Sequence, residues 1–272
     1  MPNNRKQAEQ RALWIKKKFA DEQYKQDYVT FINDIISKGY ATQVSESNIE
    51  VEEGKLWYLP HHGVYHPKKP GKIRVVFDCS CSYKGTSLNE ELLQGPNLTN
   101  SLVGVLTRFR LEPVAFMADI EAMFYQVHVP ESQRSFLRFL WWPSGNTDEC
   151  LVEYERCVHT FGAVSSPACA NFALHKTAED NKEKFGFEAS KSVKEDFYVD
   201  DFLKSKDSAQ SAIDLISQTK KMCALGGFNL TKFVSNDRTV IESVPDKDRS
   251  KNIKNLNLEL DSLPVERALG MS

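Results

Sequence analysis

The spacing of apolar residues along the chain predicts alternating helices and short strands. Over residues 5–38, apolar side chains recur mostly at steps of three and four, which is typical of amphipathic helices. Gly39 is placed to end the second helix as its C-cap. Between residues 56 and 78, strand-like runs flank the sequence Pro67-Lys68-Lys69-Pro70-Gly71, whose prolines and glycine are typical of a turn. This segment therefore predicts a β-hairpin with a basic tip.

The rest of the chain continues this alternation of helix and strand patterns. Helices are predicted over 98–110, 166–184 and 208–225, strands over 114–119, 124–129 and 228–234, and hairpins over 136–158 and 197–203. The polar and acidic stretch 42–56 predicts a loop. This order favours an α+β fold in which antiparallel sheet packs on helices along one face.

Composition narrows the class of protein. With 272 residues, 41% of them hydrophobic, the chain can form one large domain or two modest ones. It contains no apolar run of 18 residues, so we expect no membrane span. Its six cysteines form no CxxC pair, and we expect free thiols in a reducing compartment.

The charge balance gives no general attraction to nucleic acid. The formal net charge is −2, so only local basic clusters could draw in a polyanion. Three such clusters occur, at Lys16-Lys17-Lys18, at 68–74 and at Lys220-Lys221. The first and third are interpreted as solvated faces. The second, which includes Arg74, flanks a predicted strand and is the stronger candidate for binding.

Tyr198-Val199-Asp200-Asp201 is the strongest chemical signal in the chain. It places two adjacent carboxylates between apolar runs, which predicts a tight hairpin with the acids at its tip. Asp119 ends another apolar run, 114–118. Such an Asp-Asp pair can also be an ordinary turn. Three acids gathered from neighbouring strands, however, repel one another unless cations lie between them, and two-metal phosphoryl or nucleotidyl transfer uses this arrangement.

An ordered set of further motifs makes the signal more specific. The chain resembles the reverse transcriptases of long-terminal-repeat retrotransposons, and among them the BEL/Pao type. The resemblance rests on the stretches at 58–64, 72–78, 87–89, 93–96, 118–124, 136–141, 161–167, 198–201 and 269–270. It implies a right-hand polymerase with fingers and a ferredoxin-like antiparallel palm sheet. Residues 1–55 would be a helical N-terminal extension and residues 56–272 the fingers and palm, without thumb, ribonuclease H or integrase.

The resemblance implies roles for the acids. Asp119 and Asp200 would most directly hold two Mg²⁺ ions, or Mn²⁺ in their place, and Asp201 is a further candidate ligand. The backbone carbonyl of Ile120 is a candidate for a further ligand. The ions would activate the primer 3′-hydroxyl and stabilise the pyrophosphate leaving group.

The resemblance also implies contacts to the incoming nucleotide. Arg74 would bind the triphosphate, with Lys68 or Lys69 as its partner. For these residues the alternatives are a strand-edge arginine and a solvated turn. Phe124 falls at the position that would exclude a ribose 2′-hydroxyl. The alternative interpretation is a core residue of a palm strand. Lys232 is a candidate general acid toward pyrophosphate, with an ordinary surface lysine as the alternative.

Other positions would shape the primer–template contact. Tyr198 would lie under the primer end, while Gly162, Ser166 and Pro167 would form the floor beneath the templating pair. At Phe161, many retroviral enzymes have glutamine, so nucleotide contacts there are expected to differ. Leu269-Gly270 resembles the start of the primer-grip hairpin.

The function expected from these motifs is RNA-directed DNA polymerisation. Its partners would be primer–template RNA or DNA, dNTPs and other parts of a Pol polyprotein, without a membrane. The expected location is cytoplasmic, in a virus-like particle, with the nucleus as the alternative. Two rival functions are a host-retained relic that binds nucleic acid without polymerising, and another palm-type enzyme such as a cyclase. The basic fingers hairpin argues against the cyclase.

Overall fold

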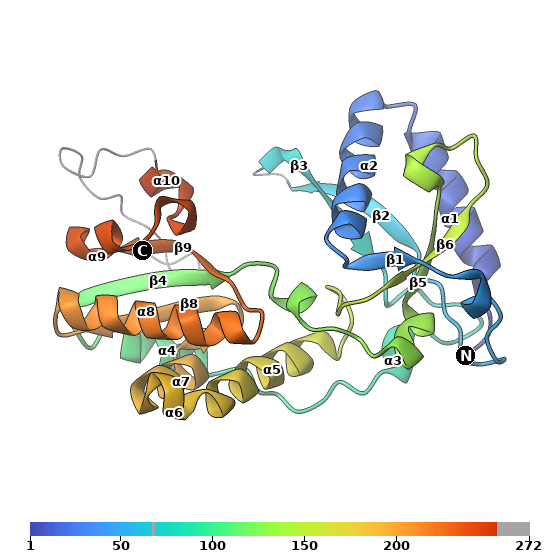
Figure 1. The fold of residues 1–272 in the computed structure, drawn as a ribbon. Helices are drawn as coiled ribbons and strands as arrows, with labels where there is room; N and C mark the ends of the chain where they lie inside the picture. Colours follow the sequence, from blue (N-terminus) through green and yellow to red (C-terminus); the bar gives the residue numbers. More distant parts are fainter. Residues whose placement is uncertain (67–68, 255–272) are drawn as a thin grey trace. The chain divides into compact units, whose positions relative to one another are not determined.

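The chain folds into two compact units. The computed structural model describes residues 1–66 and 69–254, except for the side chains at 47, 66, 69, 70 and 254 (Figure 1). Unit 1 combines Met1–Gly95 with Val127–Ser166, and unit 2 combines Pro96–Gln126 with the chain from Pro167 onward. The backbone therefore leaves unit 1 after Gly95, returns to it at Val127 and leaves it again after Ser166.

Unit 1 packs two long helices on short antiparallel sheets. The helices are α1 (Arg5–Lys18), α2 (Glu22–Ser37) and the short α3 (Leu88–Glu91). The strands are β1 (Ala41–Gln43), β2 (His61–His66), β3 (Lys69–Phe77), β5 (Arg138–Trp141) and β6 (Val152–Arg156). One sheet has the order β1-β6-β5, and β2 and β3 form a separate hairpin. Short 3₁₀ turns lie at Glu46–Asn48, Glu131–Leu137 and Pro143–Gly145.

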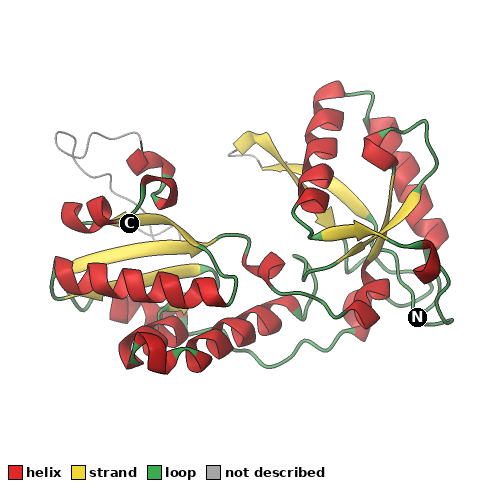
Figure 2. Ribbon diagram, viewed as in Figure 1, coloured by secondary structure: helices red, strands yellow, loops and turns green. Residues whose placement is uncertain are grey.

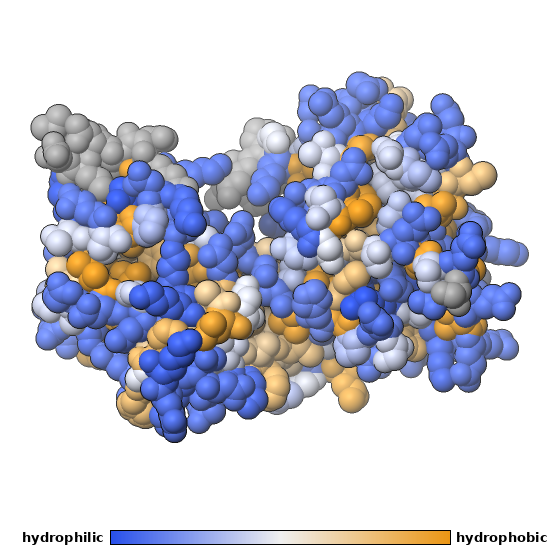
Figure 3. Space-filling view, in the orientation of Figure 1, coloured by the Kyte–Doolittle hydropathy of each residue, from blue (hydrophilic) through white to orange (hydrophobic). Residues whose placement is uncertain are grey.

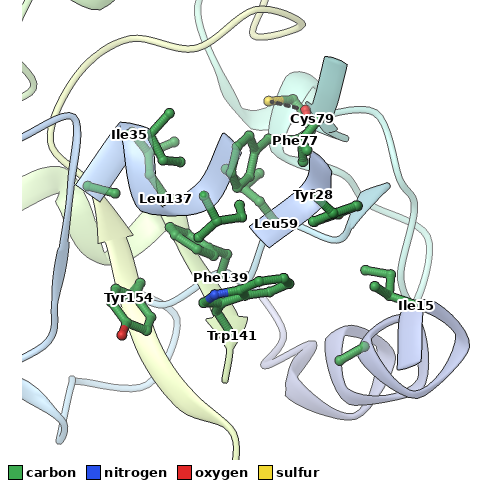
Figure 4. Packing of buried hydrophobic residues seen from close by; sticks show 14 of the residues in the cluster. Ile15, Tyr28, Ile35, Leu59, Phe77, Cys79, Leu137, Phe139, Trp141 and Tyr154 are labelled. Carbon is green, nitrogen blue, oxygen red and sulfur yellow. Dashed lines mark hydrogen bonds between the residues drawn. The ribbon is translucent and has the colours of Figure 1, made fainter. Parts of the chain in front are cut away.

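The core of unit 1 is unusually aromatic. Figure 4 shows Tyr28 of α2, Phe77 of β3 and Phe139 and Trp141 of β5 packed together. The rings of Tyr28 and Trp141 are stacked, with centroids 5.4 Å apart. His61 lies in the same cluster, with its Nδ1 2.6 Å from the Tyr28 hydroxyl and its Nε2 3.0 Å from the Leu140 carbonyl oxygen. The helices and the hairpin thus share one core.

Unit 2 is built on a four-stranded antiparallel sheet of order β7-β8-β4-β9 (Figure 2). The strands are β4 (Val114–Ile120), β7 (Phe197–Tyr198), β8 (Asp201–Lys206) and β9 (Leu230–Ser235). The helices are α4 (Leu102–Phe109), α5 (Ser166–Asp180), α6 (Lys182–Phe185), α7 (Phe187–Glu195), α8 (Ala209–Leu225), α9 (Arg238–Ser243) and α10 (Lys251–Lys254), with 3₁₀ turns at Met123–Gln126 and Asp246–Asp248. Helix α8 contacts β4, β8 and β9, while α4 contacts β7 and β8.

The expected α+β organisation, with antiparallel sheets packed on helices, is confirmed. Most predicted elements also occur, including the two N-terminal helices, the hairpin of β5 and β6, and the hairpin of β7 and β8. Gly39 follows α2 with φ of +72°, as a glycine beyond a helix end commonly does. The predicted hairpin within 56–78 is also present, although its first strand begins only at His61.

Two predicted strands occur only as isolated bridges. Tyr58 forms a parallel bridge to Arg138, in which the Arg138 N–H donates to the Trp57 carbonyl at 3.2 Å and the Leu59 N–H donates to the Arg138 carbonyl at 2.7 Å. On its other edge the Asn4 side chain bonds both backbone groups of Tyr58, donating through Nδ2 to the carbonyl at 2.7 Å and accepting at Oδ1 from the N–H at 2.8 Å.

Residues 124–129 begin in a 3₁₀ turn and pair only at His128, which bridges to Val158. In that turn the Gln126 side chain donates to the carbonyl of Glu121 at 3.2 Å, which closes the turn.

Helix α7 is an element that the hydrophobic pattern does not predict. Its buried positions are occupied mainly by small residues, Ala189, Ser190 and Ser192, with Val193 as the larger apolar one. Small and hydroxylated side chains give little periodic hydrophobic signal, although they allow close packing. The predicted helix from 166 to 184 is correspondingly divided into α5 and α6.

Candidate active site

The Tyr198–Asp201 hairpin has a two-residue loop with an unusual backbone. Tyr198 pairs with Asp201, so Val199 and Asp200 are the central residues of the turn. Val199 has φ of +57°, while Asp200 is not among the residues with positive φ. Positive φ at the first central residue alone fits a type II′ turn, where glycine is favoured. A β-branched residue in this conformation is strained, and such strain concentrates at functional sites.

The acids lie on neighbouring strands, as the sequence predicts. In the antiparallel pairing of β4 and β8, Asp119 stands directly opposite Asp201. The Ile120 N–H donates to the Asp200 carbonyl at 2.8 Å, which makes Asp119 and Asp201 a pair without hydrogen bonds between their own backbone groups. In such pairs the Cβ atoms lie only about 4.5–5.5 Å apart, and like charges destabilise the sheet.

The electrostatics of this cluster favour a cation. Burial raises the pKa of Asp201 to about 6, and repulsion from Asp200 and Asp119 adds to the effect. The pKa of Asp200 is also raised, first by burial and further by the charge of Asp119. Both shifts mean that burial and mutual repulsion disfavour the ionised carboxylates. A divalent cation would stabilise them, and carboxylate oxygens are the ligands that Mg²⁺ prefers.

In this structure Asp119 is paired with a lysine. Nζ of Lys232 lies 2.6 Å from Oδ1 of Asp119. Lys232 reaches it from a β-bulge: Met117 pairs with Val234 and Asp119 with Thr231, so β9 contains one extra residue in this interval, and Lys232 has φ of +57°. Bulges near active sites commonly redirect a side chain in this way.

The donor chemistry of the three carboxylates fits a divalent cation. They share one end of the sheet, and two of them have raised pKa values. Among the described residues, no three His, Cys, Asp or Glu side chains already stand in the positions of a complete ligand set.

A buried carboxylate anchors the base of the hairpin. Asp196, just before β7, is 1% exposed and pairs with Arg108 at 2.7 Å and with Lys204 at 2.8 Å. Asn100 also donates to the carbonyl of Phe197 at 2.9 Å. The sequence analysis did not single out Asp196 or Asn100. The only signal for Asp196 is an acid at the start of the apolar run, because its partner Arg108 is 88 residues away in sequence.

Three further candidate residues belong to unit 2. Phe124 lies in the 3₁₀ turn after β4 and is 8% exposed, so it combines the position proposed for nucleotide selection with burial typical of the core. Tyr198 ends β7 beside the acids and is half-buried. Pro167, the third of these residues, follows Ser166 in the first turn of α5.

The candidate triphosphate contacts belong to unit 1. Arg74 is exposed on β3 and stands opposite Val64 of β2, so its side chain is available to a ligand. Lys69 begins β3, and its side chain is not described; Lys68 lies outside the described residues, as does Leu269-Gly270. Lys68 and Lys69 therefore both remain candidates for the partner of Arg74.

The loop at Phe161 and Gly162 is held by a residue to which the sequence analysis gave no role. The Asn89 side chain donates through Nδ2 to the Gly162 carbonyl at 2.8 Å and accepts at Oδ1 from the Val164 N–H at 3.0 Å. Gly162 has φ of +98°, and the Phe161 side chain is 52% exposed. Ser166 is buried, and its hydroxyl donates to the Thr160 carbonyl at 2.8 Å, which gives it a structural contact.

Comparisons with known proteins identify the fold. The chain matches no protein-family profile, and no curated protein matches its sequence. A foamy viral protease-reverse transcriptase solved in complex with double-stranded DNA superimposes with a TM-score of 0.55 at 16% identity, covering 76% of this chain and 30% of that one. A prototype foamy virus protease-reverse transcriptase gives 0.56 at 15% identity, covering 78% and 24%.

A further foamy viral protease-reverse transcriptase in complex with double-stranded DNA gives a TM-score of 0.53 at 17% identity. The alignment covers 76% of this chain and 36% of that one, so the chain spans about a quarter to a third of the length of these proteins. The fold is thus polymerase-like, of the kind found in reverse transcriptases.

No helix of the described chain is long and apolar enough to cross a bilayer. The face shown in Figure 3 is mainly hydrophilic, with scattered apolar patches.

Proposed function

We propose that the chain is the reverse-transcriptase part of a BEL/Pao-type retrotransposon polyprotein. It would be an RNA-directed DNA polymerase that adds dNTPs to a primer on an RNA or DNA template. The observation that carries this proposal is the placement of Asp119 directly opposite Asp201, with Asp200 in the adjoining turn, on the sheet of a polymerase-like fold.

The acids would hold the metal ions between β4 and the β7–β8 turn. Asp119 and Asp200 are the principal ligands in this proposal, and Asp201 and the Ile120 carbonyl complete the set. When bound, two Mg²⁺ or Mn²⁺ ions supply Lewis-acid activation of the 3′-hydroxyl and stabilise the leaving pyrophosphate. The hydrogen bond from Ile120 N–H to the Asp200 carbonyl supports this role, because it fixes the turn relative to β4.

Other residues would orient the substrates. The Arg74 guanidinium suits the oxygens of a triphosphate, because its planar donors form paired hydrogen bonds, and Lys68 or Lys69 would add a second positive charge. The buried ring of Phe124 supports a role in nucleotide selection, since a rigid ring can exclude a 2′-hydroxyl. Tyr198 would contact the primer end. The Phe161–Gly162 loop would contact the nascent base pair.

Primer extension tests the proposal. Wild-type protein is incubated with a labelled primer on RNA or DNA template, dNTPs and Mg²⁺ or Mn²⁺. We expect template-dependent extension, which Asp200→Asn abolishes by removing a ligand charge. Asp214→Asn is the matched control, because Asp214 is an exposed carboxylate on α8, where it accepts a hydrogen bond from Gln210. It should extend the primer at the wild-type rate.

Failure of the wild-type protein to extend, with measurable binding to primer–template, would overturn the polymerase function. The chain would then be a nucleic-acid-binding protein without polymerase activity. Detection of a cyclic nucleotide instead of extended primer would identify a different nucleotidyl enzyme on the same fold.

A further inference from the structure

Helix α1 presents a basic and aromatic stripe to solvent. Its buried side is fixed by residues such as Ala12 and Ile15, which are 2% and 0% exposed. Arg11, Trp14 and Lys18 are spaced i, i+3 and i+7, so they follow one another along a single flank of the helix. Because the other side of α1 is packed into unit 1, this stripe is held on a rigid element.

Trp14 differs from the other tryptophans of the chain. Its side chain is 42% exposed, whereas Trp57, Trp141 and Trp142 are 0%, 0% and 3% exposed. Burying a large aromatic ring is strongly favourable, so a tryptophan held at the surface of a soluble unit suggests a ligand. It also gives a selective fluorescence signal, because Trp14 is the tryptophan that solvent and ligands can reach.

Two cations lie over the exposed ring. Lys18 Nζ is 4.0 Å from the Trp14 ring centroid, and the Arg11 guanidinium carbon is 5.8 Å from it. A stacking base would displace the Lys18 ammonium from the ring toward the adjoining phosphate. Among the described residues, neither cation forms an ion pair with a carboxylate, whereas Arg5 on the same helix pairs with Glu9. Arg11 also forms a side-chain hydrogen bond with Cys81, whereas Lys18 is exposed. Neither charge is neutralised by a described carboxylate, so both attract a polyanion.

The local potential around the stripe is positive despite the net charge of −2 for the chain. Helix α1 carries six lysine and arginine residues and the single acid Glu9. The pKa of His62 on β2 reflects this charge. Burial lowers this pKa most, and the positive charges of Arg11 and Lys18 lower it further, whereas the negative charge of Asp78 raises it. The sequence analysis interpreted Lys16-Lys17-Lys18 as a solvated face, and it did not consider Trp14.

We propose that Arg11, Trp14 and Lys18 bind single-stranded nucleic acid. An unpaired base stacks on Trp14, and the two cations hold the adjoining phosphates. Aromatic platforms within basic surfaces bind single strands in this way, with little preference for sequence. The inference rests on the proposed function and extends it, because the bound strand would be the unpaired part of the template.

A membrane surface fits the stripe less well. Helices that lie on membranes insert a continuous apolar face, and the apolar face of α1 is already buried in the core through Ala8, Ala12 and Ile15. Only Leu13 and Trp14 remain as exposed large apolar residues on this helix. The combination of a stacking ring with two cations that lack a carboxylate partner in the described chain matches a nucleotide, which offers both a base and a phosphate.

The test measures binding of a labelled unprimed oligothymidylate of about twelve nucleotides by fluorescence anisotropy. EDTA is present and dNTPs are absent. Base stacking is worth about 1–3 kcal/mol, so Trp14→Leu should weaken binding at least about fivefold, while Trp14→Phe keeps most of the affinity. Lys18→Ala should also weaken binding and reduce the salt slope by about 0.7, the value for one phosphate contact on a single strand.

Lys16→Ala is the matched control. It removes the same charge from the same helix, but Lys16 lies on the other flank, where Nζ donates to the Thr147 carbonyl at 2.5 Å. It should bind nearly as well as the wild type, and the circular dichroism of every variant should show an intact fold. Equal losses for Lys16→Ala and Lys18→Ala, with Trp14→Leu unaffected, would overturn the site in favour of unspecific charge.

Further outcomes separate the alternatives. Binding to anionic lipid vesicles that oligothymidylate does not displace would assign the stripe to membranes and overturn the proposal. Asp200→Asn should bind oligothymidylate as the wild type does. Trp14-dependent binding without primer extension would contradict only the polymerase function. If the wild-type protein extends a primer but Trp14→Leu binds oligothymidylate as tightly as the wild type, only this site would be contradicted.

Discussion

Lys232 forms an ion pair with Asp119 at 2.6 Å, although Thr231 is the residue that pairs with Asp119 across the two strands. The bulge in β9 makes this contact, since its extra residue redirects the Lys232 side chain. The ammonium thus lies against a carboxylate that is a proposed metal ligand. Lys232 offsets part of the repulsion among the acids, and it would compete with an ion for Asp119.

Removing this ammonium should strengthen metal binding. An exposed ion pair is worth up to about 1 kcal/mol, so we expect Lys232→Gln to tighten Mn²⁺ binding by about two- to fivefold. Calorimetric titration without nucleotide measures this directly. Lys206→Gln is the control, because Lys206 is on the neighbouring strand β8 and pairs with Glu188 instead. Weaker Mn²⁺ binding by Lys232→Gln would show that the lysine does not compete with the ion.

The same variant addresses the general-acid alternative for Lys232. If this lysine protonates the leaving pyrophosphate, Lys232→Gln should slow single-turnover nucleotide incorporation at saturating Mg²⁺, while metal binding is tighter. An unchanged incorporation rate would leave Lys232 with the electrostatic role alone. Metal affinity and turnover therefore report on the two roles separately.

The strained turn predicts a stabilising substitution. Val199 has φ of +57°, so Val199→Gly should relieve strain that exceeds the extra backbone entropy of glycine in the unfolded chain. We expect a gain of about 0.5–1 kcal/mol in the free energy of unfolding, measured in urea. Val103→Gly is the comparison, because Val103 is exposed in α4, where glycine costs about 1 kcal/mol. Destabilisation by Val199→Gly would show that the valine side chain stabilises the fold by more than its positive φ costs.

The Asn89 amide should control the proposed nucleotide contact. Asn89→Ala removes two hydrogen bonds to the loop at Gly162 and Val164, and we expect the KM for dNTP to rise several-fold with a smaller change in kcat. Asn89→Asp keeps the acceptor for the Val164 N–H and should lie between the wild type and Asn89→Ala. Equal KM values for all three proteins would contradict a role of this loop in nucleotide binding.

The sequence predicts the acids well because their signal is local. Asp200 and Asp201 interrupt an apolar run, and Asp119 ends one, so each is visible within a few residues. The Lys232–Asp119 pair and the pair of Asp196 with Arg108 are different, since the two residues of each pair lie 113 and 88 residues apart in the chain. A bulge or a distant cation leaves no periodic trace, so these contacts emerge only from the folded structure.

The same reasoning explains the shortened strands. Tyr58 lies in a strongly apolar run, and it pairs with Arg138 in a single parallel bridge. The opposite edge of Tyr58 bonds to the Asn4 side chain, 54 residues earlier, where a further strand would otherwise pair. β-Propensity indicates an extended backbone here, but it cannot anticipate how many residues find a strand partner.

His61 should make the stability of unit 1 depend on pH. Burial lowers its pKa from 6.5 to about 4. The unfolded chain therefore binds more protons than the folded one between these values, so stability is complete above pH 6.5 and falls as the pH drops toward 4. The shift corresponds to a loss of roughly 3 kcal/mol across this window.

Urea unfolding followed by tryptophan fluorescence should show this loss, since Trp141 lies 5.9 Å from His61 between ring centroids. His61→Phe should flatten the dependence between pH 6.5 and 4, because the phenylalanine ring cannot be protonated in the core. His128→Gln is the control, since His128 is exposed, and it should keep the wild-type profile. An unchanged slope in His61→Phe would assign the acid sensitivity to other groups.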